Sequence, residues 1–293
     1  MNLIARLKDV TEIEKLNQLS VDIVLLDTVF SVRVLNRFNF KEINKIVFHC
    51  KNFNIKTYIS INKMIHEEDL KPLKLFLEKI EKIDINGIVI SDLTVYALAK
   101  QLNLESKIIY QPGTMNTETY SIKYFEKHSI KGITLSREIT LDEIKEILFY
   151  KTNLELSIIG HGYLDMFYSK RKLLTNYFTY KNISKKDIID NYNYRLNEEI
   201  RKNDFYPILE DKYGTYIFRS HKLISWNEIE IIKSKITDFF IERIFMEDEE
   251  YFDSIKLYNG NMDIESFLIK YNNYDLGFYY KPTQMVKVVS NES

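Results

Sequence analysis

Short apolar segments alternate along most of the chain with segments of helical periodicity. The apolar segments predict eight strands, at residues 3–7, 22–26, 56–61, 87–91, 107–110, 132–135, 154–159 and 236–241. Between the early strands, apolar residues recur every three or four positions, for example over 40–53 and 70–83, as on one face of a helix. Thr140, followed by acidic residues at 142 and 143, predicts the N-cap of a helix that runs to about Tyr150. This alternation is typical of an α/β fold, and eight strands predict a (β/α)8, TIM-like barrel.

The alternation breaks after the seventh predicted strand. Residues from about 161 to 218 separate this strand from the next regular pattern, which is too long for a simple connection between a strand and a helix. We therefore expect one barrel domain over residues 1–293, with an insertion at about 161–218 that forms a lid or subdomain over the barrel mouth.

Polar or charged residues directly follow most of the predicted strands. They are Asp27, Asn62, Asp92, Gln111, Ser136, Arg137, Glu138, His161, Glu242 and Arg243. The functional site of a (β/α)8 barrel lies at the carboxyl ends of its strands. Helix N-caps also favour aspartate, which is a sufficient explanation for Asp27 and Asp92. Arginine and histidine are poor N-caps, so we expect Arg137, Glu138 and His161 to converge in one cavity.

Composition narrows the function further. The chain has 293 residues, and 41 Lys and Arg against 42 Asp and Glu leave a net charge of -1, which gives no overall field for nucleic acid. A local RNA-binding patch is still compatible with this net charge. The cations at 170–172 have Tyr168 and Tyr177 nearby, a combination that suits phosphates and unstacked bases but is also typical of a solvated loop. Cys50 is the single cysteine, so an internal disulfide and an all-cysteine metal site are excluded. Without a signal-peptide pattern or a membrane-length apolar run, we expect a cytoplasmic chain with no membrane association and no metal.

The common enzyme signatures are missing from the sequence. It contains no GxSxG, HExxH, P-loop or GxGxxG motif. Cys50 and His49 are adjacent in a predicted helix, where neighbouring side chains point in different directions, so they do not predict a nucleophile–base pair.

Three segments carry a resemblance to a known family. The first is LSREITLDEI at 135–144, and the second is HGYLDMFYSKRKLL at 161–174. The third places Arg201 before a Tyr-Pro pair at 206–207, an acidic pair at 210–211 and Gly-Thr at 214–215. In this order and spacing they resemble the collagenase-like peptidase family U32. The resemblance implies oxygen-independent hydroxylation, of a tRNA wobble uridine, of a ribosomal RNA cytidine or of quinone precursors, although the conventional label is peptidase.

Several relatives hold an iron–sulfur cluster on cysteines, and this chain departs from that pattern. Asp165 and Lys172 stand at the two signature cysteine positions. An ammonium and a carboxylate do not replace cluster thiolates, so we expect no cluster and no other cofactor in this chain. Residues 166–174 look most like the shorter member of a paired set associated with 5-hydroxyuridine formation in tRNA. The resemblance therefore implies tRNA, a paralogous U32 protein and a small-molecule hydroxyl donor as partners.

We assign provisional roles on this basis. Arg137 clamps a carboxylate or phosphate, Glu138 orients it, and His161 transfers a proton or contacts a base edge. The residues expected to bind substrate are Asn62, Thr114, Asn116, Ser136, Gly162, Ser169, Lys170, Arg171, Glu210 and Asp211. Two alternatives stay open: a peptidase that activates water with Glu138, Glu210 or Asp211, and a non-catalytic partner subunit of a paralogous U32 protein.

Overall fold

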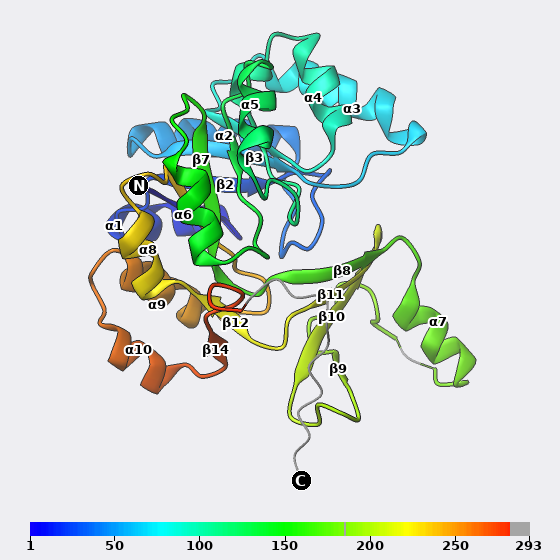
Figure 1. Ribbon diagram of the computed structural model, residues 1–293. Helices are drawn as coiled ribbons and strands as arrows, with labels where there is room; N and C mark the ends of the chain where they lie inside the picture. The colour runs from blue at the N-terminus through cyan, green and yellow to red at the C-terminus, as the bar shows by residue number, and fades with distance from the viewer. Residues whose placement is uncertain (185, 282–293) are drawn as a thin grey trace.

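A closed barrel of eight parallel strands forms the body of the protein in the computed structural model, which describes residues 1–184 and 186–281 (Figure 1). The strands are β1 (Asn2–Arg6), β2 (Ile23–Asp27), β3 (Lys56–Ile61), β4 (Gly87–Ile90), β5 (Ile108–Tyr110), β6 (Gly132–Thr134), β7 (Glu155–Gly162) and β13 (Asp238–Ile241). The barrel closes because β13 pairs in parallel with both β1 and β7. The predicted (β/α)8 barrel is confirmed, with strand ends within a few residues of those expected from the sequence.

The barrel strands are apolar on both faces, as parallel strands covered by helices must be. All five residues of β2 are buried, and only the aspartate at its end is charged. The strands belong to one continuous apolar core that also takes the inner faces of the surrounding helices.

Helices join the barrel strands and cover them. They are α1 (Ile13–Gln18), α2 (Phe40–Asn52), α3 (Glu67–Ile80), α4 (Leu93–Lys100), α5 (Thr119–Glu126), α6 (Leu141–Phe149), α8 (Trp226–Ile232), α9 (Asp248–Tyr258) and α10 (Ile264–Lys270), with 3-10 turns at Val10–Glu12 and Glu105–Lys107. The predicted start of α6 is confirmed: the Thr140 hydroxyl accepts a hydrogen bond from the Glu143 amide, while the Glu143 carboxylate accepts one from the Thr140 amide.

The residues after β7 form a second, antiparallel sheet. Its strands run in the order β8 (Asp165–Ser169), β11 (Gly214–Phe218), β10 (Phe205–Asp211) and β9 (Arg195–Asn197), and α7 (Leu173–Tyr180) follows β8. In Figure 1 the β9–β11 strands and α7 project away from the barrel. The chain then returns through β12 (Lys222–Ile224), which pairs with β7 and with β14 (Tyr274–Asp275).

The second sheet is fastened to the long loop between β2 and α2. Arg37 in this loop donates to Asp211 at 2.9 Å. The Tyr213 hydroxyl donates to the Val29 carbonyl at 2.6 Å, and a tyrosine at 192 makes a similar bond to the loop at 2.8 Å. These contacts hold the sheet over the carboxyl ends of the barrel strands.

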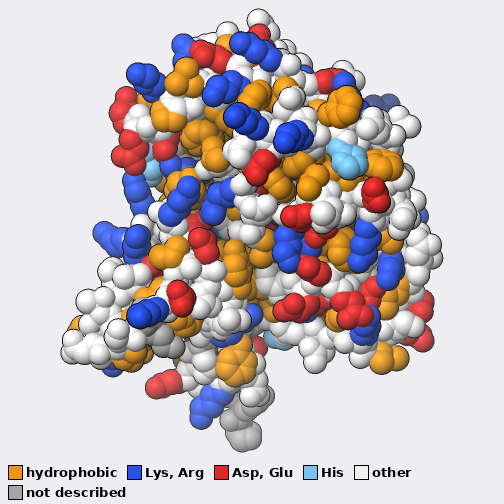
Figure 2. All heavy atoms as spheres, turned by 180° about the vertical axis from the view of Figure 1, so that it is seen from behind, with side chains coloured by type: hydrophobic (Ala, Val, Ile, Leu, Met, Phe, Trp, Pro, Cys, Tyr) orange, Lys and Arg blue, Asp and Glu red, His pale blue; other side chains and the backbone are white. Residues whose placement is uncertain are grey.

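The outer surface carries charges of both signs. Figure 2, seen from behind, shows Lys and Arg side chains at the edge where the inserted sheet leaves the barrel, beside a body with mixed charges. Over the described part of the chain, the helices are too short or too polar to cross a bilayer.

Candidate active site

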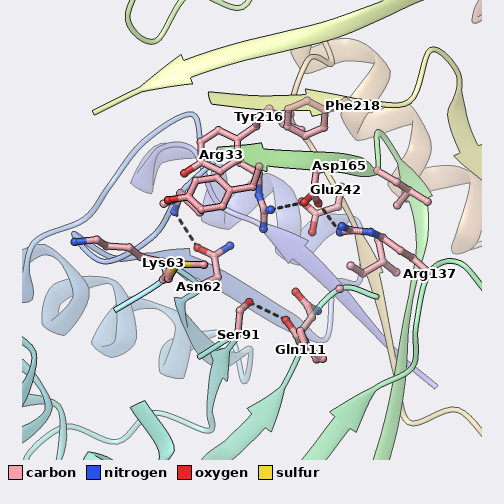
Figure 3. Close-up of a pocket in the computed structure, with 18 of the residues that line it drawn as sticks. Arg33, Asn62, Lys63, Ser91, Gln111, Arg137, Asp165, Tyr216, Phe218 and Glu242 are labelled. Carbon is pink, nitrogen blue, oxygen red and sulfur yellow. Dashed lines mark hydrogen bonds and ion pairs between the residues drawn. The ribbon is translucent and has the colours of Figure 1, made fainter. Parts of the chain in front are cut away.

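A cavity of about 460 Å³ lies at the carboxyl ends of the barrel strands, between the barrel and the inserted sheet (Figure 3). The barrel supplies one side, with polar groups at the end of β1 and in the loops after β3, β4, β5, β6 and β13. Strands β8 and β11 cover the other side. The charged and polar lining residues are Arg6, Arg33, Asn62, Lys63, Ser91, Asp92, Gln111, Arg137, Asp165, Tyr168, Tyr216 and Glu242.

Two arginines share one carboxylate at the centre of this cavity. Arg33 from the β2–α2 loop and Arg137 after β6 both donate to Asp165, the first residue of β8. Figure 3 shows the aspartate between the two guanidinium groups. Burial alone would raise the pKa of Asp165, but the two arginine charges hold it below its ordinary value. Asp165 is therefore ionised at neutral pH and joins the inserted sheet to the barrel.

A second ion-pair group lies beneath the first. Arg6 at the end of β1 donates to Asp27, and to Glu242 at 3.1 Å. Burial raises the pKa of Asp27 to about 6 although the Arg6 charge opposes this shift, so the carboxylate is still mainly ionised at pH 7. Arg6 thus has two carboxylate partners of its own.

The remaining polar groups shape the wall of the cavity. Asn62 accepts a hydrogen bond from the Val32 amide at 2.9 Å and so fixes the start of the β2–α2 loop. The Ser91 hydroxyl donates to the Gln111 carbonyl at 2.7 Å, which ties two neighbouring strand ends together. Apolar side chains complete the lining: Val32, Met64, Leu93, Pro112, Ile159, Tyr163, Leu164, Phe218 and Ile244. The lining is therefore mixed, and the cavity suits a ligand that has both polar groups and apolar surface.

His161 does not lie in this cavity, and the expectation that it converges with Arg137 is wrong. A bulge in β7 explains the difference, because Phe240 pairs with Ile159 while the next residue of β13 pairs with His161. The extra residue, Gly160, turns His161 to the outer face of the strand. A side chain at Gly160 would come within 2.0 Å of the Phe239 ring, so the bulge requires glycine.

The His161 ring is buried among aromatic residues between the barrel and helices α9 and α10. Its Nδ1 lies 3.1 Å from the Tyr258 hydroxyl and its Nε2 lies 3.3 Å from the Tyr274 hydroxyl. Burial, and then the charge of Lys222, lowers the pKa of His161 to about 3. The ring is neutral at pH 7 and is part of the packing.

Gly162 has a role in the backbone that differs from the one predicted. Its φ of 102° lies in the region that favours glycine, and a Cβ there would come within 2.4 Å of the Glu242 carbonyl. The close approach that it permits is to β13 of the protein itself, whereas the sequence predicted an approach by substrate.

The predicted residues around Arg137 hold its loop without lining the large cavity. The buried Asn116 donates to the Thr134 carbonyl at 2.9 Å, and Ser136 accepts from the Glu138 amide at 3.2 Å. Glu138 is half-buried and Thr114 is exposed. Of the three residues predicted to be catalytic, the structure places Arg137 alone in the cavity.

Glu210 and Asp211 are buried and do not line the cavity, contrary to the expectation that they bind substrate there. Glu210 accepts from the backbone amides of Leu174 and Thr175 at 2.9 and 3.2 Å, where α7 begins. Asp211 accepts from the turn that follows it and from Arg37. Both carboxylates stabilise the inserted sheet. Because Glu138 also lies outside the cavity, none of the three carboxylates considered for a peptidase is placed to activate water there.

The cations predicted to bind substrate lie on the outside of the insertion. Lys170 and Arg171 are exposed between β8 and α7, and Ser169 accepts from the Arg171 amide at 3.2 Å. Lys170 approaches Glu68 at the start of α3, at 4.0 Å. These residues border the barrel without lining the cavity.

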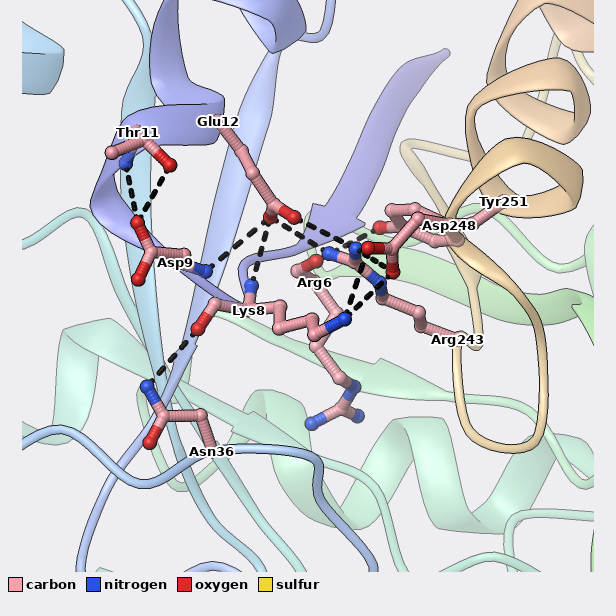
Figure 4. A network of polar contacts seen from close by, with 9 residues as sticks. All are labelled: Arg6, Lys8, Asp9, Thr11, Glu12, Asn36, Arg243, Asp248 and Tyr251. Atoms are coloured by element: carbon pink, nitrogen blue, oxygen red, sulfur yellow. Dashed lines mark hydrogen bonds and ion pairs between the residues drawn. The ribbon is translucent and has the colours of Figure 1, made fainter. Parts of the chain in front are cut away.

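Arg243, which the sequence grouped with Arg137 and His161, belongs to a structural network (Figure 4). Its two terminal nitrogens donate to Glu12 at 2.7 Å, and one of them also donates to Asp248 at 2.8 Å. Glu12 also accepts from backbone amides of the loop after β1. The network fastens this loop to the start of α9, on the outside of the barrel.

Asp165, Glu242 and Arg33 are among the cavity residues that were not assigned to the site from the sequence. For Asp165 the sequence offers one signal, because the resemblance to family U32 implies a cysteine at this position. Glu242 carries another, because it directly follows the eighth predicted strand. Arg33 lies in an irregular loop and has no sequence signal.

The donors present do not fit an iron–sulfur cluster. Cys50 is buried in α2, and burial raises the pKa of its thiol to about 11. Both Asp165 oxygens are occupied by arginines, while Lys172 is an exposed cation. Within residues 1–184 and 186–281, no group of three or more His, Cys, Asp or Glu is arranged to hold a metal ion.

Comparisons with known proteins agree with the resemblance in the sequence. The chain is 26% identical over 278 residues to tRNA hydroxylation protein P2 of Bacillus subtilis, covering 87% of this chain and 89% of that protein. It is 24% identical over 146 residues to tRNA hydroxylation protein P1 of the same organism, covering 49% of this chain and 34% of that protein. The solved structure of the U32 peptidase Mk0906 has the same fold, with a TM-score of 0.51 at 15% identity over 82% of this chain and 92% of that one. The profile of peptidase family U32 matches residues 8–268, and the chain belongs to this family.

Proposed function

We propose that this protein takes part in the hydroxylation of tRNA, at the wobble uridine, as a cytoplasmic member of family U32. The observation that carries the proposal is the similarity to tRNA hydroxylation protein P2 over nearly the full length of both chains. The cavity at the barrel mouth is the candidate site of the reaction, and Arg137 is its candidate ligand-binding residue.

The surface of the insertion supports a contact with RNA. Lys170, Arg171 and Lys172 are exposed directly before α7. Tyr177 and Tyr180 on that helix are 53% and 80% exposed. Exposed cations bind phosphates and exposed aromatic rings stack on bases, so α7 and the segment directly before it are the proposed contact for a single-stranded tRNA loop.

The chain's own residues do not supply a redox group, so the proposal includes a small-molecule hydroxyl donor and no resident cofactor. It also includes a paralogous U32 protein as a partner. The similarity to tRNA hydroxylation protein P1 supports the presence of such paralogues in one organism.

Mass spectrometry of nucleosides from total tRNA tests the proposal. Cells that lack this protein should contain less 5-hydroxyuridine and its derivatives than cells that carry it, measured against an unrelated modified nucleoside as the control. Equal amounts in both strains, with any paralogous gene also deleted, would refute a role in tRNA hydroxylation.

A further inference from the structure

The two arginines of the cavity use only part of their hydrogen-bonding capacity. Each guanidinium donates one terminal nitrogen to Asp165, Arg33 to one oxygen and Arg137 to the other. Among the described residues, no hydrogen bond occupies the other side-chain nitrogens of either arginine, and the Nε of Arg137 is buried without a partner. A guanidinium can bind an oxyanion through two parallel N–H groups, so donors for a second anion are available on both residues.

The backbone conformation of Arg33 indicates that the surrounding structure fixes the position of this arginine. Its φ of 58° lies in the left-handed region, which is unfavourable for arginine. Such a conformation persists where the surrounding structure fixes it, and it occurs preferentially at functional sites. Here the guanidinium lies over the Tyr216 ring at 5.5 Å and reaches Asp165 across the cavity.

The charges around the arginine pair do not balance. Two guanidinium groups and one carboxylate leave one positive charge at Asp165. Lys63 pairs with Asp69, whereas Arg6 pairs with two carboxylates, Asp27 and Glu242, and that group carries one negative charge. Asp92 is a further carboxylate of the lining and caps α4. The positive charge of the cavity is therefore confined to the arginine pair.

We propose that Asp165 is a positioning residue that holds Arg33 and Arg137 as a two-arginine site for one singly charged oxyanion of a ligand. The inference rests on the proposed function in so far as this cavity is the reaction site. The oxyanion is a carboxylate of a small molecule or a phosphodiester of RNA, since both present two oxygens to a guanidinium edge.

Ligand binding to the purified full chain tests the inference without RNA and without turnover. Benzoate provides a carboxylate on an apolar ring, benzamide is its neutral counterpart, and dimethyl phosphate represents the phosphodiester. Calorimetry and the midpoint of thermal unfolding measure binding to the wild type, to Arg33→Met and Arg137→Met, and to Asp165→Asn. Arg201→Met, at an exposed arginine outside the cavity, is the control.

We expect benzoate or dimethyl phosphate to bind the wild type and benzamide to bind at least roughly tenfold more weakly, because charged hydrogen bonds are lost. Arg33→Met and Arg137→Met should each lose that preference, and the control should keep it. Asp165→Asn should bind the preferred anion roughly tenfold more tightly, because the site gains one net positive charge. This gain should disappear when Asp165→Asn is combined with Arg33→Met and Arg137→Met, because Asp165 acts through these two cations.

If Asp165→Asn folds poorly without ligand, the inference is supported when the preferred anion restores a cooperative thermal unfolding transition to this variant. The preferred probe identifies the source: benzoate indicates a small-molecule acid, and dimethyl phosphate indicates RNA. The inference is overturned if neither anion is preferred to benzamide by the wild type, or if Arg33→Met responds like the wild type. These outcomes do not depend on the tRNA nucleoside measurement, so either proposal can fail alone.

Discussion

Replacing His161 by phenylalanine distinguishes a packing role from proton transfer. The ring is buried and its pKa is lowered to about 3 by burial and by Lys222. An unfolded histidine has a pKa of about 6.5, so folding favours the neutral ring. This contribution to stability is complete above pH 6.5 and is lost as the pH falls toward 3. At pH 4.5 the loss amounts to roughly 3 kcal/mol, because each pH unit below the unfolded pKa corresponds to somewhat more than about 1 kcal/mol.

His161→Phe should therefore be less sensitive to acid than the wild type. At pH 7 the variant loses the contacts with the Tyr258 and Tyr274 hydroxyls, at a cost of about 1–3 kcal/mol. Between pH 7 and pH 4.5 the wild type should lose roughly 3 kcal/mol more of its free energy of unfolding than the variant does. Urea denaturation followed by circular dichroism at both pH values measures this difference. The reasoning is refuted if both proteins lose the same free energy, or if the folded variant abolishes tRNA modification.

Three further changes test other parts of the structure. Replacing the cations at 170–172 by alanine should weaken the binding of tRNA of every sequence. The slope of log binding constant against log salt concentration should become shallower by about 0.7 per lost contact with single-stranded RNA. An unchanged slope in filter binding would show that this surface does not contact the RNA. Gly160→Ala should destabilise the barrel by about 3 kcal/mol or more, because its Cβ would overlap the Phe239 ring; a wild-type urea midpoint would show that the bulge is dispensable. Glu210→Gln should lower the local stability of the start of α7 by about 1–3 kcal/mol, because the hydrogen bonds from its first amides are weakened. Limited proteolysis should then cut at α7 while the barrel stays resistant. An unchanged cleavage pattern would contradict the role of Glu210 at the start of this helix.

The barrel could be predicted because its strands are buried on both faces and its helices have one apolar face. Both patterns are local, and the capping residues at Thr140 and Glu143 mark a helix start within four positions. The length of the insertion was also visible, since no strand–helix rhythm continues after β7. Its antiparallel sheet was not predicted, because residues of β8 and β11 that pair, such as Ser169 and Thr215, lie far apart in the chain.

The site was predictable only where it follows strand ends directly. Arg137 and Asn62 were found in this way and both line the cavity. His161 was misplaced because a bulge of one residue reverses the face on which every later side chain of the strand lies. Arg33 was missed because its position depends on a left-handed backbone and on contacts with β8, neither of which leaves a pattern in the sequence.

The central claim is that this U32 protein acts in tRNA hydroxylation through the cavity around Arg137. The direct measurement is the amount of 5-hydroxyuridine in tRNA from a deletion strain that carries the wild-type gene, Arg137→Met or the control Arg201→Met, at equal levels of folded protein. We predict that the wild type and the control restore the nucleoside and that Arg137→Met does not. Full restoration by Arg137→Met, or none by the wild type, would contradict the claim.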